Sequence, residues 1–132
     1  MLDDILVDTS VWIEFFRSKE SSVSLRVREY LKLNQACYTG PIAVELYQGA
    51  RSSKEVEVID QLLETIHYVE ITRLHYHHAG QIGRKAARSG KPFSTVDLIL
   101  AVVAHDEQLR LFSLDIHFEG ISHFCPLSLE NL

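Results

Sequence analysis

Four acidic side chains stand in segments whose other residues predict buried, apolar structure. Asp8 follows ILV, Glu45 interrupts IAVELY, Asp97 lies within STVDLILAVVA, and Asp115 follows RLFSL. A buried carboxylate without a partner is unstable, so it takes up a proton, pairs with a cation or coordinates a metal. These segments offer no obvious lysine or arginine partner for each carboxylate. A shared metal site is therefore one interpretation of the pattern.

Each carboxylate also has an ordinary structural interpretation. Asp8 is a residue type that caps helices, and Asp97 lies three residues after Ser94, which is the spacing of a capping box. Glu45 would reach solvent from the rim of its helix, and Asp115 would occupy a turn. We favour the joint interpretation, because two strand ends and two buried helices would bring all four carboxylates to one edge of a parallel sheet.

A cluster of carboxylates needs a cation. Close pairs repel by about 4 kcal/mol at an effective dielectric constant of about 20, and Mg2+ with its preference for oxygen ligands removes that repulsion. Zinc would favour histidine and cysteine ligands, and none of these four segments offers such a pair at metal-binding spacing. His117, two residues after Asp115, is the one residue near the four acids that could serve as a zinc ligand. One or two Mg2+ ions can activate water to cleave a phosphodiester. We expect the hydroxyls of Thr9, Ser10 and Ser113 to orient that water or a phosphate oxygen.

The elements that must position these residues follow from the hydrophobic pattern. Short apolar strands alternate with helices, which predicts an α/β fold with a parallel sheet covered on both faces. We expect four strands, at residues 5–7, 37–39, 68–71 and 109–114, and a short edge strand at residues 126–129. We expect helices at residues 10–17, 21–33, 42–49, 54–65, 74–88 and 94–104. Ligands bind beyond the carboxyl ends of such strands, where Asp8 and Asp115 lie.

Length and composition favour one folded domain over residues 1–132. The chain is 46% hydrophobic and 23% charged, and no apolar run approaches the length of about 20 residues that spans a bilayer. Asp3 and Asp4 stand where a secretory signal would carry basic residues, so we expect a cytoplasmic protein without a membrane partner. Cys37 and Cys125 lack CxxC spacing and are interpreted as small buried side chains, with a disulfide less favoured.

Four segments of the chain resemble the PIN domain. The matching motifs are ILVDTSVWIEFF, PIAVELYQGA, TVDLILAVVAH and LRLFSLDIHFEGI, which together run from residue 5 to residue 121. The size and order of these segments are similar to those of VapC-type toxins of bacterial or archaeal toxin–antitoxin pairs. The resemblance implies a three-layer α/β/α fold with a central, mainly parallel sheet of four or five strands.

The resemblance also implies a metal-dependent endoribonuclease that binds Mg2+ or Mn2+, cuts structured RNA such as transfer or ribosomal RNA, forms a homodimer and is inhibited by a cognate antitoxin. It assigns metal binding and catalysis to Asp8, Glu45, Asp97 and Asp115. It assigns supporting roles to Thr9, Ser10 or Ser113. Family members often carry a further aspartate just before the phenylalanine of the last motif, where this chain has His117 beside Phe118.

The net charge of −5 has the wrong sign for binding nucleic acid through bulk electrostatics alone. Bound divalent metal would reduce it, and basic side chains around the cleft would then grip phosphates. The candidates for this contact with RNA are Arg51, Lys54, Arg84, Lys85 and Arg88. An ordinary solvated helix face explains the last three equally well.

Two other motifs of the chain have ordinary structural interpretations. HYHH at residues 75–78 suggests a zinc site through His75 and His78, but without a third ligand we favour a surface helix. Trp12, Phe15 and Phe16 are interpreted as core residues rather than as a platform for stacking bases.

A non-catalytic PIN-fold protein that binds RNA or a partner is the alternative to the enzyme. A phosphotransfer receiver domain ranks last, because no lysine follows a late strand.

Overall fold

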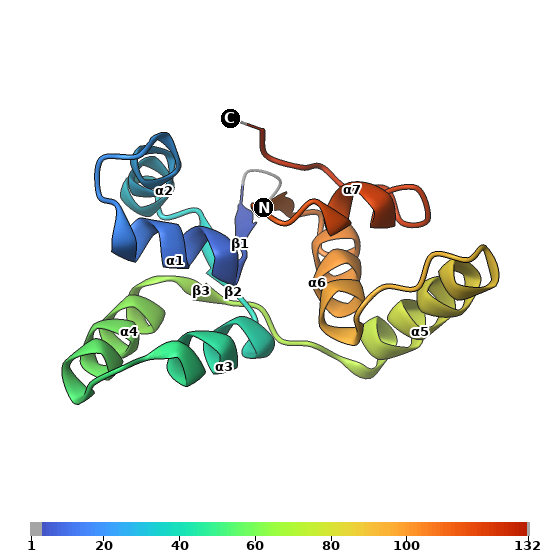
Figure 1. Cartoon of the computed structure of the whole chain (residues 1–132), viewed down its shortest axis with the longest axis horizontal. Coiled ribbons are helices and arrows are strands. Elements are labelled where there is room, and N and C mark those ends of the chain that lie inside the picture. Colours follow the sequence, from blue (N-terminus) through green and yellow to red (C-terminus); the bar gives the residue numbers. More distant parts are fainter. Residues whose placement is uncertain (1–3, 132) are drawn as a thin grey trace.

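A parallel sheet of four strands, in the order β3-β2-β1-β4, forms the centre of the protein (Figure 1). The structure is a computed structural model and describes residues 4–131. The strands are β1 (Ile5–Val7), β2 (Ala36–Tyr38), β3 (His67–Tyr68) and β4 (Arg110–Phe112). β1 pairs with both β2 and β4, and β2 pairs with β3, all in parallel. The predicted parallel sheet is confirmed.

Seven helices cover this sheet within the described residues. They are α1 (Thr9–Arg17), α2 (Ser22–Lys32), α3 (Gly40–Gly49), α4 (Ser53–Thr65), α5 (Arg73–Arg88), α6 (Thr95–Asp106) and α7 (His117–Ile121). In Figure 1, α1, α2 and α4 lie to the left of β1, and α5 and α6 lie to its right. The pattern predicted every helix except α7, whose first turn is preceded by Ile116 and has no side-chain cap.

The strand order brings two distant segments of the chain together. From β1 the chain adds β2 and then β3 on one side, and β4 returns to the other side of β1. The side on which strands are added therefore changes at β1, between β2 and β4, and ligands of open parallel sheets bind at such a switch point. The residues that follow β1 and β4 are neighbours at this edge, since the backbone N–H of Asp8 donates to the carbonyl of Phe112 at 2.9 Å.

The core lies between the sheet and the helices. Residues 100–104 of α6 are all buried, which confirms the prediction for this apolar helix. Trp12 is also fully buried, and its indole Nε1 donates to the carbonyl of Val7 at 3.0 Å. Phe15 is half-buried against the core, whereas Phe16 is exposed, so the prediction of a core position is wrong for Phe16. Phe16 lies at the margin of the buried face of α1, where 39% of its surface is exposed.

The two cysteines are free and buried, as predicted. Burial raises the pKa of Cys37 to about 11, and burial also raises the pKa of Cys125 to about 11. Both thiols therefore stay protonated at neutral pH. Among the described residues, no helix is long and apolar enough to cross a membrane.

The predicted edge strand at residues 126–129 is reduced to one parallel bridge between Leu111 and Leu129. The N–H of Leu111 donates to the carbonyl of Ser128 at 2.9 Å, and the N–H of Glu130 donates to the carbonyl of Leu111 at 2.8 Å. Pairing cannot extend through Pro126, which has no N–H group. These two backbone hydrogen bonds are supplemented by contacts of the side chain of Glu130.

Glu130 anchors the C-terminal segment to α2 and β4. Its carboxylate accepts hydrogen bonds from Arg26 and Tyr30, and from Arg110 Nη1 at 3.1 Å. Burial alone would raise the pKa of Glu130, but the hydrogen bonds from Tyr30 and Arg26 and the charges of both arginines lower it below its usual value. The carboxylate therefore stabilises the fold mainly in its charged form.

Glu130→Gln should lower the free energy of unfolding by about 1–2 kcal/mol near neutral pH, because it removes charge-assisted hydrogen bonds whose arginine partners remain partly solvated. A lowered pKa in the folded state stabilises above the unfolded pKa, and this stabilisation is lost as pH falls through the folded pKa. The difference between wild type and variant should therefore shrink below about pH 4. Urea unfolding at several pH values measures it. Glu57→Gln on α4, where the residue is exposed, is the matched control, and an equal loss in both variants would contradict the role of Glu130.

Candidate metal centre at the ends of β1 and β4

Asp8 begins the site directly after β1. The residue is only 7% exposed and occupies the N-cap position of α1, but its side chain makes no capping hydrogen bond. Its Oδ2 instead accepts from Ser10 Oγ at 3.0 Å and from Ser113 Oγ at 2.7 Å. The interpretation of this carboxylate as a helix cap is therefore wrong. Two hydroxyls hold it toward the residues that follow β4.

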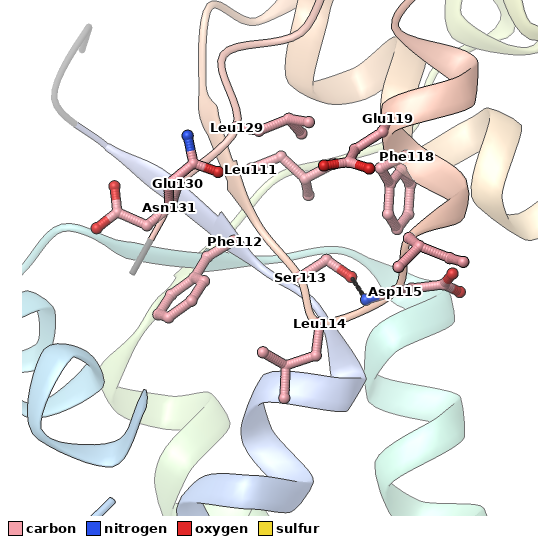
Figure 2. Close-up of a pocket in the computed structure, with 11 residues that line it drawn as sticks. Leu111, Phe112, Ser113, Leu114, Asp115, Phe118, Glu119, Leu129, Glu130 and Asn131 are labelled. Atoms are coloured by element: carbon pink, nitrogen blue, oxygen red, sulfur yellow. Dashed lines mark hydrogen bonds between the residues drawn. The ribbon is translucent and has the colours of Figure 1, made fainter. Parts of the chain in front are cut away.

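The turn after β4 is fastened to Asp8 through the same two serines. Ser113 Oγ accepts from the backbone N–H of Asp115 at 3.0 Å, as Figure 2 shows. Ser10 Oγ accepts from the N–H of Leu114 at 3.0 Å. Ser10 and Ser113, predicted to orient water or phosphate, are therefore engaged in positioning a carboxylate and a turn.

Asp97, Asp115 and His117 form a compact group at this turn. Each offers one ligand atom, and these atoms lie within 4.8 Å of one another. His117 Nδ1 is 3.1 Å from Asp115 Oδ1 and 3.6 Å from Asp97 Oδ2. Asp97 comes from the first turn of α6, where its N–H donates to Ser94 Oγ at 3.1 Å. The backbone of Asp97 thus takes part in capping, while its carboxylate lies in the group.

The charges of this group are poorly compensated. Burial raises the pKa of Asp97, and the negative charges of Asp115 and Asp8 raise it further, while Ser94 and His117 lower it. Asp8 and Asp115 therefore both lie close enough to oppose ionisation of Asp97. Within residues 4–131, no lysine or arginine forms an ion pair with the carboxylate of Asp8, Asp97 or Asp115. A bound cation would supply the missing positive charge.

The donor atoms fit a divalent cation. Carboxylate oxygens are the ligands that Mg2+ and Mn2+ prefer, and His117 adds one ring nitrogen. The group is partly exposed, which leaves space for the waters that such ions retain. A family model described as the PIN domain matches residues 5–123. The chain belongs to the PIN-domain family.

This PIN-domain chain is similar to other proteins over most of its length. The VapC ribonuclease Mb1587 of Mycobacterium bovis is 28% identical over 127 residues, which cover 93% of this chain and 95% of the relative. The tRNA(fMet)-specific endonuclease VapC of Shigella flexneri is 30% identical over 102 residues, or 73% of this chain and 74% of the relative. The DNA-bound VapBC structure from Salmonella typhimurium gives a TM-score of 0.80 at 18% identity and covers 97% of each chain. That structural likeness confirms the predicted PIN-like α/β/α fold.

Glu45 joins the PIN-domain site less directly than the other three acids. It lies on α3, and its Oε1 accepts from Thr9 Oγ1 at 2.6 Å. Thr9 follows Asp8 in the chain, so this bond ties α3 to the start of α1. Glu45 is exposed and lies outside the group of Asp97, Asp115 and His117. Its place at the edge of the site supports the rim position that its sequence also allowed.

Two further residues at this edge were not singled out by sequence reasoning. Thr39 follows β2 as Asp8 follows β1, and its fully buried Oγ1 has no hydrogen-bond partner among the described residues. Glu119 lines a cavity of about 280 Å³ together with Asp115 (Figure 2). The position of Thr39 after a predicted strand, and the spacing of four residues from Asp115 to Glu119, were the available signals.

The basic residues predicted to contact RNA are all exposed, and they fall into two groups. Arg51 and Lys54 flank the turn from α3 to α4, which lies at the lower left in Figure 1. Arg84, Lys85 and Arg88 lie in the C-terminal half of α5, at the right of the same view. The two groups therefore lie on opposite sides of the molecule, and their contact with RNA stays a prediction.

Proposed function

We propose that this PIN domain is a metal-dependent endoribonuclease, the toxin of a toxin–antitoxin pair, which hydrolyses RNA phosphodiester bonds. The observation that carries the proposal is the meeting of Asp97, Asp115 and His117 beside Asp8, at the edge where parallel strands present ligands. The match of residues 5–123 to the PIN-domain model supports the proposal. The match to the PIN-domain family argues against a receiver domain.

Mg2+ or Mn2+ would be held by Asp97 and Asp115, with Asp8 and His117 as neighbouring donors. When bound, such an ion activates water and stabilises the charge that develops on the phosphodiester. The protein's own contribution is to fix the donors, since Ser10 and Ser113 both donate to Oδ2 of Asp8. Burial and the negative charges of Asp115 and Asp8 raise the pKa of Asp97, and a bound cation would act in the opposite direction by favouring the charged carboxylate.

The names of the relatives support RNA as the substrate and an antitoxin as the partner. Similar proteins are named VapC ribonuclease and tRNA(fMet)-specific endonuclease, and similar folds occur in structures of VapBC complexes. We extend these names to this chain: its substrate is RNA and its inhibitor is a cognate antitoxin. A structured RNA as the substrate and a homodimer as the active form stay predictions from the family resemblance. The exposed basic residues of α5 are the proposed contact with phosphates.

Removal of divalent metal should abolish cleavage. Purified protein, dialysed against EDTA, is incubated with transfer RNA and ribosomal RNA, and Mg2+ or Mn2+ is then restored. We expect discrete products only when metal is present, with single cut sites located by mapping the RNA ends. Undiminished cleavage in EDTA would contradict the role of metal. No cleavage across a broad RNA pool, together with no binding of Mn2+, would favour a non-catalytic binding protein.

A further inference from the structure

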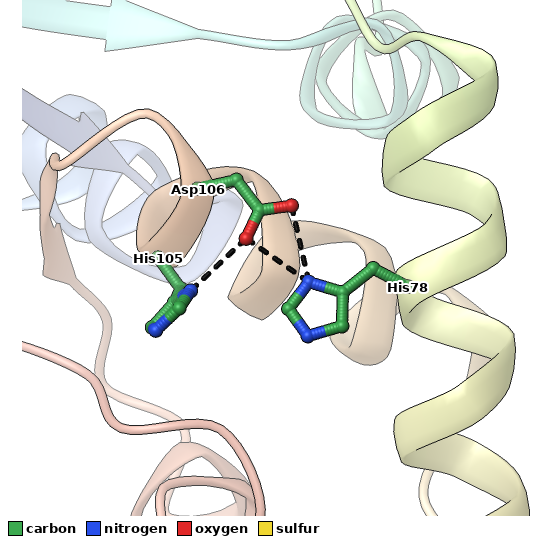
Figure 3. A group of neighbouring side chains, drawn as sticks. All are labelled: His78, His105 and Asp106. Carbon is green, nitrogen blue, oxygen red and sulfur yellow. Dashed lines mark hydrogen bonds and ion pairs between the residues drawn. The ribbon is translucent and has the colours of Figure 1, made fainter.

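A second group of possible metal ligands lies between α5 and α6, at the far end of α6 from Asp97. His78 projects from α5, and His105 and Asp106 end α6 (Figure 3). One ligand atom from each lies within 4.8 Å of the others. Asp97 and Asp106 are separated by about 13 Å along the helix, at a rise of about 1.5 Å per residue. This group is therefore separate from the carboxylates of the proposed nuclease site.

Both imidazoles face the same carboxylate oxygen. Asp106 Oδ1 is 3.0 Å from His78 Nδ1 and also 3.0 Å from His105 Nδ1. Ligands bound at about 2.0–2.1 Å are about 3.0 Å apart in octahedral and about 3.3 Å apart in tetrahedral geometry. Each imidazole nitrogen is thus spaced from the carboxylate oxygen as two ligands of one ion are, and a ring nitrogen of His78 lies within 4.8 Å of a ring nitrogen of His105. A bound ion would replace the two hydrogen bonds to Asp106 Oδ1.

The surroundings of this group favour a cation. Asp106 is the last residue of α6, and the carbonyl end of a helix carries a partial negative charge. Burial acts to raise the pKa of Asp106, but hydrogen bonds from His105 and His78 lower it overall, so the carboxylate is charged at neutral pH. All three side chains are partly exposed, which leaves an approach from solvent and room for a bound water.

His75 does not take part in this group, although the HYHH motif pointed to it. The residue is only 4% exposed, and its Nδ1 accepts from the N–H of Thr72 at 2.9 Å. Its Nε2 must then carry the proton and donates to Glu107 Oε2 at 2.9 Å. Both ring nitrogens are engaged, so His75 serves as a helix cap. The zinc interpretation of HYHH lacked a third ligand because the other ligands come from α6.

We propose that His78, His105 and Asp106 form a zinc-binding site that joins α5 to α6. Two histidines and one carboxylate are a ligand set that zinc accepts, with water in the fourth position. The two imidazole nitrogens disfavour Mg2+, which prefers oxygen ligands. Zinc bound here would bridge two helices that pack against each other, and its effect would be on stability rather than on RNA cleavage.

The test measures Zn2+ binding by titration calorimetry in a full-length background that carries Asp97→Asn and Asp115→Asn, so that the other candidate metal group is disabled. We expect one tightly bound Zn2+ per chain and a higher unfolding temperature when Zn2+ is added. His105→Gln and His78→Gln should each weaken binding by at least about tenfold, since even a residue that only supports a ligand costs that much. His77→Gln changes a neighbouring exposed histidine of the same helix and should bind Zn2+ like the background.

Asp106→Asn, which keeps the size of the side chain, provides a third variant in case a histidine variant fails to fold. Circular dichroism in EDTA establishes folding before each titration. Loss of Zn2+ binding in folded His78, His105 or Asp106 variants, but not in His77→Gln, supports the proposal. Zn2+ binding that is equal in all variants, or absent from the background protein, overturns it. Excess Mg2+ should not displace the bound Zn2+, and displacement by Mg2+ would also count against the site.

Discussion

Asp97→Asn should reduce RNA cleavage by at least about a hundredfold while leaving the protein folded. The substitution keeps the shape of the side chain but removes a carboxylate that lies with Asp115 and His117 within 4.8 Å. The neutral amide carries no negative charge, so it binds a divalent cation more weakly than the carboxylate does. Initial rates on one defined RNA, measured at several concentrations of Mn2+, give the loss.

The same substitution should stabilise the protein when metal is absent. Burial and the charges of Asp115 and Asp8 raise the pKa of Asp97, so the ionised carboxylate destabilises the fold above its unfolded pKa. Removing it relieves this cost at neutral pH, and the gain should fade as the wild-type carboxyl takes up its proton at lower pH. Urea unfolding in EDTA measures the difference. A residue kept only for structure would show the opposite sign.

Glu57→Gln is the control for both measurements, because it also removes one negative charge but lies on the exposed face of α4. It should change neither cleavage nor unfolding beyond experimental error. Asp97→Asn protein that is folded and still cuts RNA at the wild-type rate would refute the metal site as the source of activity. Loss of cleavage together with loss of stability would instead assign Asp97 a structural role.

The sequence was most informative where a polar residue interrupts a strong apolar pattern. Asp8 after β1 and Asp97 within the buried helix α6 were selected for this reason, and the structure brings both to the edge that holds Asp115. The resemblance to the PIN domain added the fold, which the family match confirms. Local pattern was sufficient here because burial makes an unpaired carboxylate costly wherever it occurs.

The sequence was least informative where a contact joins distant segments without an apolar signal. The bond from Thr9 to Glu45 and the bond from Ser113 to Asp8 depend on side-chain directions that no periodicity specifies. The short helix α7 has too few residues for a detectable hydrophobic period. The pairing of His78 with the end of α6 depends on how two helices pack. Tertiary geometry decides all of these features.

Ser113→Ala should lower RNA cleavage by about tenfold to a hundredfold, mainly by weakening the binding of metal. Ser113 Oγ donates to Asp8 Oδ2 at 2.7 Å and accepts from the N–H of Asp115 at 3.0 Å, so one hydroxyl positions two acids of the site. Its loss leaves Asp8 with Ser10 as its remaining hydroxyl donor among the described residues. The cleavage rate is titrated with Mn2+ to separate apparent metal affinity from maximal rate.

If Ser113 positions the acids, Ser113→Ala should reduce the free energy of Mn2+ binding by more than it reduces the free energy of unfolding. Ser113→Thr keeps the hydroxyl and should recover a substantial part of the affinity. Ser53→Ala, at an exposed position of α4, controls for loss of a serine as such. Equal Mn2+ affinity in Ser113→Ala and wild type would show that Asp8 holds its position without this bond. In that case Ser10, whose hydroxyl reaches the same oxygen, would suffice to direct Asp8 toward the metal.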